Sequence, residues 1–437
     1  MTECILPGLE FPAVCKRRVD ARFDGGHVSS NGGALLIRQT DRRLRVTRRA
    51  ARLLEDARQQ GKVDHSALSI IRQRVFGVAL GYDDLNDHDF IRHDLCFQGA
   101  VDRDRPLASS STLCRFENSM TRSTAVALNG LLVDIFIESF DKPPRELVLD
   151  FDATDVPVHG DQVGRFFHGF YRGYCFLPLY VTCGSQLLVS YLRPSSKDGA
   201  RHAWAILSLL VRRFRQVWPN VRIIFRADSG FCRHRMLNWC DRVGVGYIVG
   251  LPRNKRLERM CSRTREKARR SFLQSGRKVR RFIDIGYAAS TWKRKRRVIV
   301  KSEYNTLGPN TRFVVTNVPG KAQPLYDELY CGRGDMENRI KEQKLDLFAD
   351  RTSCHDWWPN QFRILISSLA YVLLEGMRRL ALRGTELAHA RCSTIRLKLL
   401  KVGAVVTKNT RRLRLMLNSA YPWQNLFHLV AQRLAIE

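Results

Sequence analysis

The chain lacks the cysteine patterns of a metal-stapled or disulfide-stapled protein. It has 437 residues and 12 cysteines, but none forms a Cys-x2-Cys pair and no Cys/His set has zinc-finger spacing. A chain of this length can bury a large core without staples, so we expect reduced, buried thiols. A structural zinc site and a disulfide framework are both disfavoured.

Targeting and membrane signals are also missing, as are the motifs of nucleotide-binding and zinc-protease enzymes. No charged-then-apolar segment opens the chain, and the longest apolar runs, such as Ile364 to Leu374, are too short to span a bilayer. There is no Walker lysine motif and no His-Glu-x-x-His. We therefore expect a cytoplasmic protein that contacts no membrane and needs no nucleotide.

Negative charge is scarce. The 74 Lys and Arg residues outnumber the 42 Asp and Glu residues, which gives a net charge of +32 and a pI of about 10.3. Such self-repulsion is tolerated mainly where a polyanion neutralises it, and nucleic acid is the usual polyanion. Short basic proteins of the ribosomal type are the alternative, but a hydrophobic content of 44% predicts a large folded protein.

Hydrophobic periodicity divides the chain into regions. Apolar residues at helical spacing predict a helical N-terminal domain over residues 1–142. Within it, a serine-capped helix would present Thr112, Arg115 and Asn118 to a DNA groove as a helix-turn-helix does, although a plain helical bundle fits equally well. From residue 143 to 251 the pattern changes to a meander of three strands and then alternating helix and strand. That order predicts an α/β, ribonuclease-H-like core with a mixed sheet.

Residues 252–324 interrupt this core. They lack strong helical periodicity and contain three strand-like pieces, and residues 251–300 hold 18 Lys and Arg against 3 Asp and Glu. Because folded segments lie on both sides, we expect a basic, β-rich insertion domain facing phosphates instead of a solvated tail. The core then resumes over residues 325–384, and residues 385–437 form a basic C-terminal region.

The most informative segment runs from Tyr330 to Lys344. On one helix, at about 100° per residue, Tyr330, Arg333, Glu337 and Lys344 fall within an arc of roughly 60°. A carboxylate that shares a narrow stripe with two cations and a phenol suits a metal ion beside a phosphodiester. The alternative is an ordinary surface ion pair between Arg333 and Glu337.

Two strand ends supply further carboxylates. Asp150 and Asp152 point to the same face of an otherwise apolar strand, where aspartate is disfavoured. Asp228 follows a second strand, at the end where α/β folds place their chemistry. Three carboxylates of this kind can hold two Mg²⁺ or Mn²⁺ ions about 4 Å apart for phosphodiester cleavage and transfer.

These residues resemble a known family. The Tyr-x2-Arg-x3-Glu-x6-Lys signature is similar to that of DDE transposases of bacterial insertion sequences, within which the insertion-sequence thirteen-eighty family matches best. The matching pieces cover nearly the whole chain in order: Ser29-Ser-Asn-Gly-Gly-Ala, Gly81-Tyr-Asp-Asp-Leu-Asn-Asp-His-Asp, Leu107-Ala-Ser-Ser-Ser-Thr-Leu-Cys-Arg-Phe-Glu, Leu149-Asp-Phe-Asp-Ala-Thr, Arg226-Ala-Asp-Ser-Gly-Phe, Arg312-Phe-Val-Val-Thr-Asn and the Tyr330–Lys344 segment.

The resemblance implies a function and assigns roles. It implies an N-terminal domain that binds terminal inverted repeats, cut-and-paste DNA transposition, and two Mg²⁺ or Mn²⁺ ions held by Asp152, Asp228 and Glu337, with Asp150 as the backup for Asp152. It also implies that Tyr330, Arg333 and Lys344 contact DNA. Because two transposon ends must be joined, we expect a homodimer on double-stranded DNA. The alternatives are a ribonuclease-H-like nuclease without strand transfer and a catalytically inactive DNA-binding protein.

One aromatic residue of the insertion lies among cations. Trp292 stands beside Arg294, Lys295 and Arg296, and we expect all four side chains to contact DNA. Related transposases stack a flipped base on an aromatic residue of their insertion domain. Stacking of that kind contributes roughly 1–3 kcal/mol per base. A strand tryptophan that packs on its own sheet is the competing interpretation.

Overall fold

The computed structural model describes residues 8–435, which divide into two compact units. The first comprises the chain up to Met120, together with Asp346–Phe348 and the residues from Leu369 onward. The second comprises Thr121–Leu345 and Ala349–Ser368. The N-terminal and C-terminal regions, which the sequence predicts as separate domains, therefore belong to one unit.

The first unit is mainly helical, as predicted for the N-terminal region. Its first part contains α1 (Ala34–Leu44), α2 (Val46–Arg52), α3 (Ala67–Leu80), α4 (Asp87–Ile91), α5 (Leu95–Val101) and α6 (Ser110–Asn118). Its last part contains α15 (Cys392–Ile395), β15 (Ala404–Lys408), β16 (Leu413–Leu417) and α16 (Gln424–Leu434). The long helix α14 (Trp357–Met377) begins in the second unit and ends in the first.

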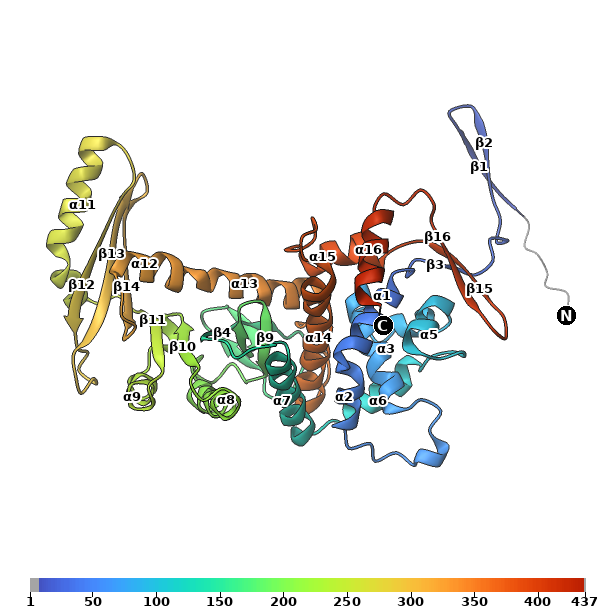
Figure 1. Cartoon of the computed structure of the whole chain (residues 1–437), viewed down its shortest axis with the longest axis horizontal. Coiled ribbons are helices and arrows are strands. Elements are labelled where there is room, and N and C mark those ends of the chain that lie inside the picture. The colour runs from blue at the N-terminus through green and yellow to red at the C-terminus, as the bar shows by residue number, and fades with distance from the viewer. Residues whose placement is uncertain (1–7, 436–437) are drawn as a thin grey trace. The chain divides into compact units, whose positions relative to one another are not determined.

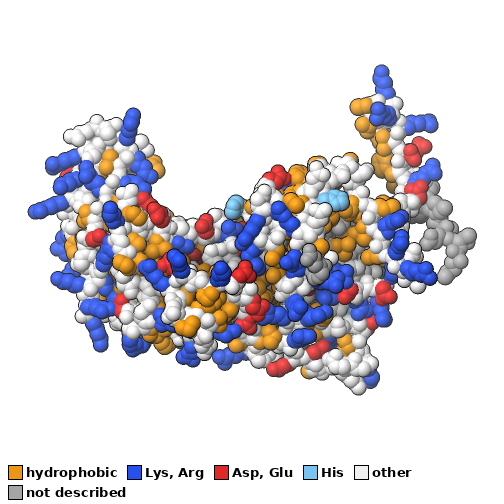
Figure 2. Space-filling model, in the orientation of Figure 1, with side chains coloured by type: hydrophobic (Ala, Val, Ile, Leu, Met, Phe, Trp, Pro, Cys, Tyr) orange, Lys and Arg blue, Asp and Glu red, His pale blue; other side chains and the backbone are white. Residues whose placement is uncertain are grey.

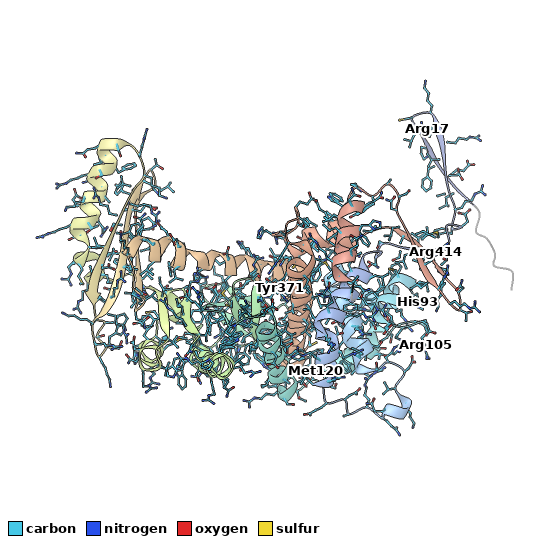
Figure 3. The ribbon with its side chains drawn as sticks, viewed as in Figure 1. Arg17, His93, Arg105, Met120, Tyr371 and Arg414 are labelled. Atoms are coloured by element: carbon cyan, nitrogen blue, oxygen red, sulfur yellow. The ribbon has the colours of Figure 1, made fainter. Side chains whose placement is uncertain are left out.

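The start of the described chain has more structure than its turn-rich sequence predicts. β1 (Leu9–Val14) and β2 (Arg17–Ala21) form an antiparallel hairpin, with Arg17 near its turn (Figure 3). The short strand β3 (Val28–Ser29) pairs with β15 in a sheet of order β16-β15-β3. β1 and β2 thus pair locally with each other, whereas β3 is held by a partner far away in sequence.

Two consecutive glycines allow the first and last parts of this unit to meet. A Cβ on Gly33 would lie 1.9 Å from the Leu399 carbonyl oxygen. The Gly32 amide donates to the Val402 carbonyl oxygen at 2.8 Å. The Ser29–Gly33 motif therefore has a packing role, since only glycine permits so close a backbone approach.

The second unit is a mixed α/β structure built on one eight-stranded sheet of order β12-β13-β14-β11-β10-β4-β8-β9 (Figure 1). The meander is β4 (Glu146–Ala153), β8 (Leu179–Cys183) and β9 (Gln186–Tyr191), and α8 (Ala203–Val217), β10 (Arg222–Ala227), α9 (His234–Val243) and β11 (Gly246–Leu251) follow. β10 runs parallel to both β4 and β11, whereas β8 is antiparallel to β4 and β9. The predicted order of elements is confirmed.

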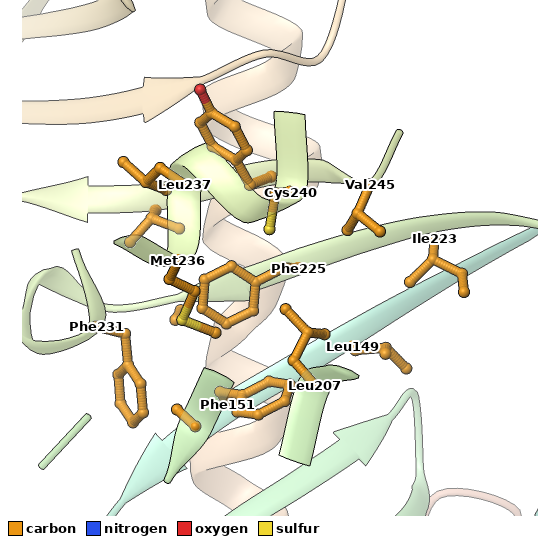
Figure 4. Close-up of a cluster of buried hydrophobic side chains, with 14 of the residues drawn as sticks. Leu149, Phe151, Leu207, Ile223, Phe225, Phe231, Met236, Leu237, Cys240 and Val245 are labelled. Carbon is orange, nitrogen blue, oxygen red and sulfur yellow. The ribbon is translucent and has the colours of Figure 1, made fainter. Parts of the chain in front are cut away.

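Alternating apolar residues bury one face of this sheet. Leu149 and Phe151 of β4 lie beside Ile223 and Phe225 of β10 in a cluster that α8 and α9 complete, as Figure 4 shows. The Phe151 and Phe225 rings meet edge to face with their centres 5.1 Å apart. Because the strands are fixed by this packing, the residues at their carboxyl ends have little freedom.

The insertion differs from the prediction in two ways. Its strands β12 (Val279–Tyr287), β13 (Arg296–Asn305) and β14 (Gly308–Thr316) extend the core sheet, because β14 pairs with β11. It also contains the helices α10 (Lys255–Met260) and α11 (Ser262–Ser275), which the weak periodicity did not reveal. Figure 2 shows Lys and Arg side chains crowded over the part that carries α11 and β12.

The remaining elements of the second unit complete the frame of the site. α7 (Arg122–Glu138) contacts β9, and a small sheet of order β5-β7-β6 branches from the end of β4, with β5 (Val156–Pro157), β6 (Phe166–His168) and β7 (Gly173–Phe176). Among residues 8–435 no single helix is long and apolar enough to cross a membrane; only the bent pair α6 and α7 reaches that length and composition together.

Candidate active site

Asp152 and Asp228 stand at the carboxyl ends of two neighbouring parallel strands. β4 and β10 pair in register, with Phe151 beside Ala227, so the next residue on each strand is one of the two aspartates. Asp152 is partly buried, and Asp228 accepts a hydrogen bond from the Gly230 amide at 2.9 Å. Strand pairing alone therefore brings together two carboxylates that lie far apart in sequence.

The third carboxylate comes from a helical segment whose pitch changes along its length. Leu325–Tyr330 is a π-helix, Cys331–Arg333 is a 3₁₀ turn, α13 covers Gly334–Lys341, and Glu342–Asp346 is again a π-helix. The prediction assumed a uniform α-helix. Glu337 nevertheless lies on the same side as Arg333. Glu337 is within the regular helix α13, and Arg333 directly precedes that helix.

Arg333 bridges two of the three carboxylates. Its Nη1 donates to Asp152 Oδ2 at 3.1 Å, and its Nη2 donates to Glu337 Oε1 at 2.6 Å. The surface ion pair between Arg333 and Glu337 is therefore present. It is not isolated, however, because the same guanidinium also reaches the end of β4.

Burial and like charges act together on Asp152. Burial raises the pKa of this carboxyl from 3.8 to about 6, against the opposing effect of the Arg333 charge. The nearby charges of Asp228 and Glu337 contribute to this rise. A carboxylate held among other carboxylates in a partly dry site gains stability from any added cation.

Asp150 has a different role. Its carboxylate is buried and forms a two-pronged ion pair with Arg226, whose Nη2 donates to Oδ2 at 2.7 Å. Nη1 of Arg226 donates to the Leu329 carbonyl oxygen, so the pair ties the end of β4 to the segment that carries Arg333 and Glu337. Burial raises the pKa of Asp150, whereas Arg226 lowers it. Asp150 is occupied by this pair, and Asp152 is the aspartate that faces Glu337.

The remaining signature residues surround the same place. Lys344 Nζ donates to the Asp155 carbonyl oxygen at 2.7 Å and forms an ion pair with its carboxylate at 3.2 Å. Tyr330 lies next to Gly250. A Cβ added to Gly250 would lie 2.8 Å from the Tyr330 hydroxyl oxygen. Burial raises the pKa of Tyr330, and the Asp228 charge acts in the same direction. The segment thus contacts β11 through Tyr330, and the end of β4 and the residues after it through Arg333 and Lys344.

These carboxylates fit a divalent ion in chemistry, but a cation of the protein itself stands between two of them. A cavity of about 300 Å³ lies between β4 and α13 and is lined by Asp152, Ala153, Thr154, Glu337, Ile340, Lys341, Lys344 and Leu345. Carboxylate oxygens are the ligands that Mg²⁺ and Mn²⁺ prefer. Within residues 8–435, no three acidic, His or Cys side chains lie close enough to share an ion. The Arg333 guanidinium takes the place between Asp152 and Glu337.

The basic cluster around Trp292 has a structural arrangement. Trp292 is half-buried, with its ring centre 5.6 Å from that of Tyr287 and the Arg296 guanidinium 5.8 Å away. Arg296 is 5% exposed and pairs with Asp241, as does Arg294. Burial and pairing with Asp241 leave the Arg296 charge little access to DNA, and its predicted DNA contact stays a prediction. Arg294 and Lys295 are exposed.

The structure of the candidate recognition helix fits both interpretations, a helix that enters a DNA groove and a plain bundle helix. α6 exposes Arg115 and Asn118, and Thr112 is half-exposed and accepts a hydrogen bond from Arg115 at 3.4 Å. Leu113 and Phe116 on the opposite side are buried. This arrangement suits a helix that presents polar side chains to a groove, and it equally suits a bundle helix with a solvated face.

Sequence reasoning missed three residues near the carboxylates. Arg226 lies within a matching motif, but its pairing with Asp150 follows only from the parallel register of β4 and β10. Asp155 stands three residues after Asp152 and carries no signal of its own. Burial raises the pKa of Tyr171 to about 12, and the charges of Asp155 and Asp152 add to this effect, so its ring lies near the site.

One family model matches nearly the whole chain. The family model described as Transposase DDE domain group 1 matches residues 11–436. No curated protein matches the chain. Among solved structures, the chain is similar to one described as the cryo-EM structure of the piggyBac transposase synaptic complex with hairpin DNA. That similarity has 10% sequence identity and a TM-score of 0.42, and it covers 92% of this chain and 82% of the other.

Proposed function

The chain belongs to the Transposase DDE domain group 1 family, and on that premise we propose that it binds the terminal inverted repeats of a bacterial insertion sequence. It cleaves the DNA at those ends and transfers the freed 3′-hydroxyl to target DNA. DNA transposition is the function of this family. The finer assignment to the insertion-sequence thirteen-eighty family, with a ribonuclease-H-like core, rests on the motifs and on the order of the strands.

One observation carries the proposal. Asp152 and Asp228 are neighbours across parallel strands, and Arg333 links Asp152 to Glu337. Three carboxylates, contributed by two strand ends and one helix, match the set that the signature implies. The buried pair of Asp150 and Arg226 supports Asp152 as the first of the three.

The roles of the residues follow from their chemistry. Asp152, Asp228 and Glu337 would hold the two Mg²⁺ or Mn²⁺ ions, which supply an activated water and stabilise charge on the leaving oxygen. Arg333 and Lys344 would bind phosphate oxygens beside the scissile bond, where a guanidinium can bind two of them at once. Tyr330 positions the segment against β11.

The partner is double-stranded DNA. The net charge of +32 and the crowding of Lys and Arg over α11 and β12 support electrostatic binding to the phosphate backbone. Joining two ends calls for a homodimer on DNA, and we place the protein in the bacterial cytoplasm, on the nucleoid when it is bound.

The test compares two carboxylates of the same helix. Glu337→Gln should abolish Mg²⁺-dependent cleavage of a plasmid that carries the DNA flanking the gene, while binding to those ends is kept. Asp335→Asn removes an exposed carboxylate two residues away and should leave cleavage intact. Cleavage by Glu337→Gln would overturn the assignment. A pre-cleaved end that wild-type protein fails to join to target DNA would favour a nuclease without strand transfer.

A further inference from the structure

A strongly aromatic hairpin projects next to the candidate active site. β6 and β7 pair with Phe166 beside Cys175 and Phe167 beside Tyr174, and Phe170 lies in the turn between them. Phe170 is 81% exposed, Phe167 60% and Tyr174 51%. Folding alone does not require aromatic side chains at such exposed positions, and neighbouring exposed apolar residues commonly mark a binding surface.

The opposite side of this hairpin is firmly packed. Phe176 of β7 is fully buried in a cluster with Val156 and Ile364, and its ring meets that of Trp357 edge to face at 5.4 Å. A Cβ on Gly164, just before β6, would lie 2.6 Å from Trp357. The exposed rings are therefore presented by a rigid element.

The hairpin is joined directly to the strand that carries Asp152. β5 begins four residues after Asp152 and pairs with β7, with Val156 beside Phe176. The Val158 amide donates to the Tyr174 carbonyl oxygen at 3.0 Å. Asp155, which lies between Asp152 and β5, is the partner of Lys344. A strand of DNA that reaches the carboxylates therefore passes within reach of the aromatic rings.

The charges on the hairpin favour nucleic acid over an apolar protein surface. The Arg165 guanidinium lies 4.9 Å from the centre of the Tyr174 ring, and Arg172 is exposed in the turn. Phosphates alternate with bases along a DNA strand, so cations beside ring faces match its chemistry. Arg165 is already paired with Asp161 at 2.7 Å, but a hydrophobic protein partner would leave the Arg172 charge without a counterpart.

We propose that Phe167, Phe170 and Tyr174 form a stacking platform for unpaired bases of the DNA strand that enters the carboxylate site. The rings accept any base, because every base has an apolar face. The platform holds the end of the cut strand open beside Asp152. It has the base-stacking role that the sequence suggested for Trp292. This inference rests on the proposed function, since it names the form of DNA that the site takes.

The test uses full-length protein without divalent metal, so that binding is measured and cleavage is not. Two duplexes of identical paired sequence are compared by fluorescence anisotropy: one is blunt and one carries six unpaired thymidines at one 3′ end. Wild-type protein should bind the second more tightly. Phe170→Leu with Tyr174→Leu should remove that preference, with a loss of about tenfold for the tailed duplex and little change for the blunt one.

Further variants separate stacking from other effects. Phe170→Trp should keep the preference, because it keeps a ring, and Phe90→Leu changes an equally exposed ring on α4 and should also keep it. If the double leucine variant keeps the preference for the tailed duplex, the platform is overturned. Failure of the wild-type protein to bind either duplex would instead count against the proposed function.

Discussion

Arg333 donates a hydrogen bond to Asp152 at 3.1 Å across 181 residues of sequence. The same guanidinium pairs with Glu337 one turn further along its helix. A single cation therefore already bridges two of the carboxylates proposed to hold metal. Metal binding and the position of Arg333 are consequently linked, because both compete for the same oxygens.

Removing this guanidinium should strengthen metal binding. Arg333→Met takes away a positive charge that repels the ion and occupies its ligands, so Mn²⁺ should bind roughly fivefold more tightly, which corresponds to about 1 kcal/mol. Titration calorimetry on the DNA-free protein measures this. Arg339→Met removes a neighbouring arginine that pairs with Glu342 and serves as the control. Equal Mn²⁺ affinities for wild type and Arg333→Met would contradict the link.

The two aspartates of β4 should differ sharply in their effect on stability. Asp150→Asn leaves the Arg226 guanidinium buried without its counter-charge, which costs about 3–5 kcal/mol. Asp152→Asn instead removes a like charge from the site and should leave the melting temperature unchanged or raised. Thermal unfolding of both variants without metal provides the comparison. A larger loss in Asp152→Asn would mean that the roles are reversed.

The raised pKa of Asp152 should appear in the pH dependence of stability. Between pH 3.8 and about 6 the folded protein holds a proton on this group that the unfolded chain has released. Its contribution is fully present below pH 3.8 and is lost as pH rises through 6, a change of roughly 2–3 kcal/mol. Melting curves of wild type and Asp152→Asn over pH 4–7 should converge at the acid end. Parallel curves would show that the carboxyl is unperturbed.

Trp292 should matter for folding more than for DNA. Its ring packs on Tyr287 and Arg296, so Trp292→Ala should lower stability by about 2 kcal/mol, whereas Trp292→Phe should restore much of it. The footprint on the DNA that flanks the gene should be the same for all three proteins. A lost contact at the end of the footprint in Trp292→Ala, with stability unchanged, would restore the base-stacking interpretation.

Local patterns predicted much of this protein. Period-two alternation predicted β4 and β10 nearly to the residue, and helical spacing brought Arg333 and Glu337 to one side. Both follow from backbone geometry, which repeats within a few residues. The excess of Lys and Arg needs no structure at all, and it predicted a polyanion partner.

The rest depended on contacts between distant segments. The sequence could not decide whether Asp150 or Asp152 is the first metal ligand, because both point to one face of β4. Only the register with β10 pairs Asp150 with Arg226. Likewise, only the pairing of β14 with β11 joins the insertion to the core sheet, and only the tertiary structure shows that Arg296 is buried against Asp241. Sequence alone determined which side chains are available for the chemistry. The tertiary structure decided which of them face one another, since strand register and burial depend on residues far away along the chain.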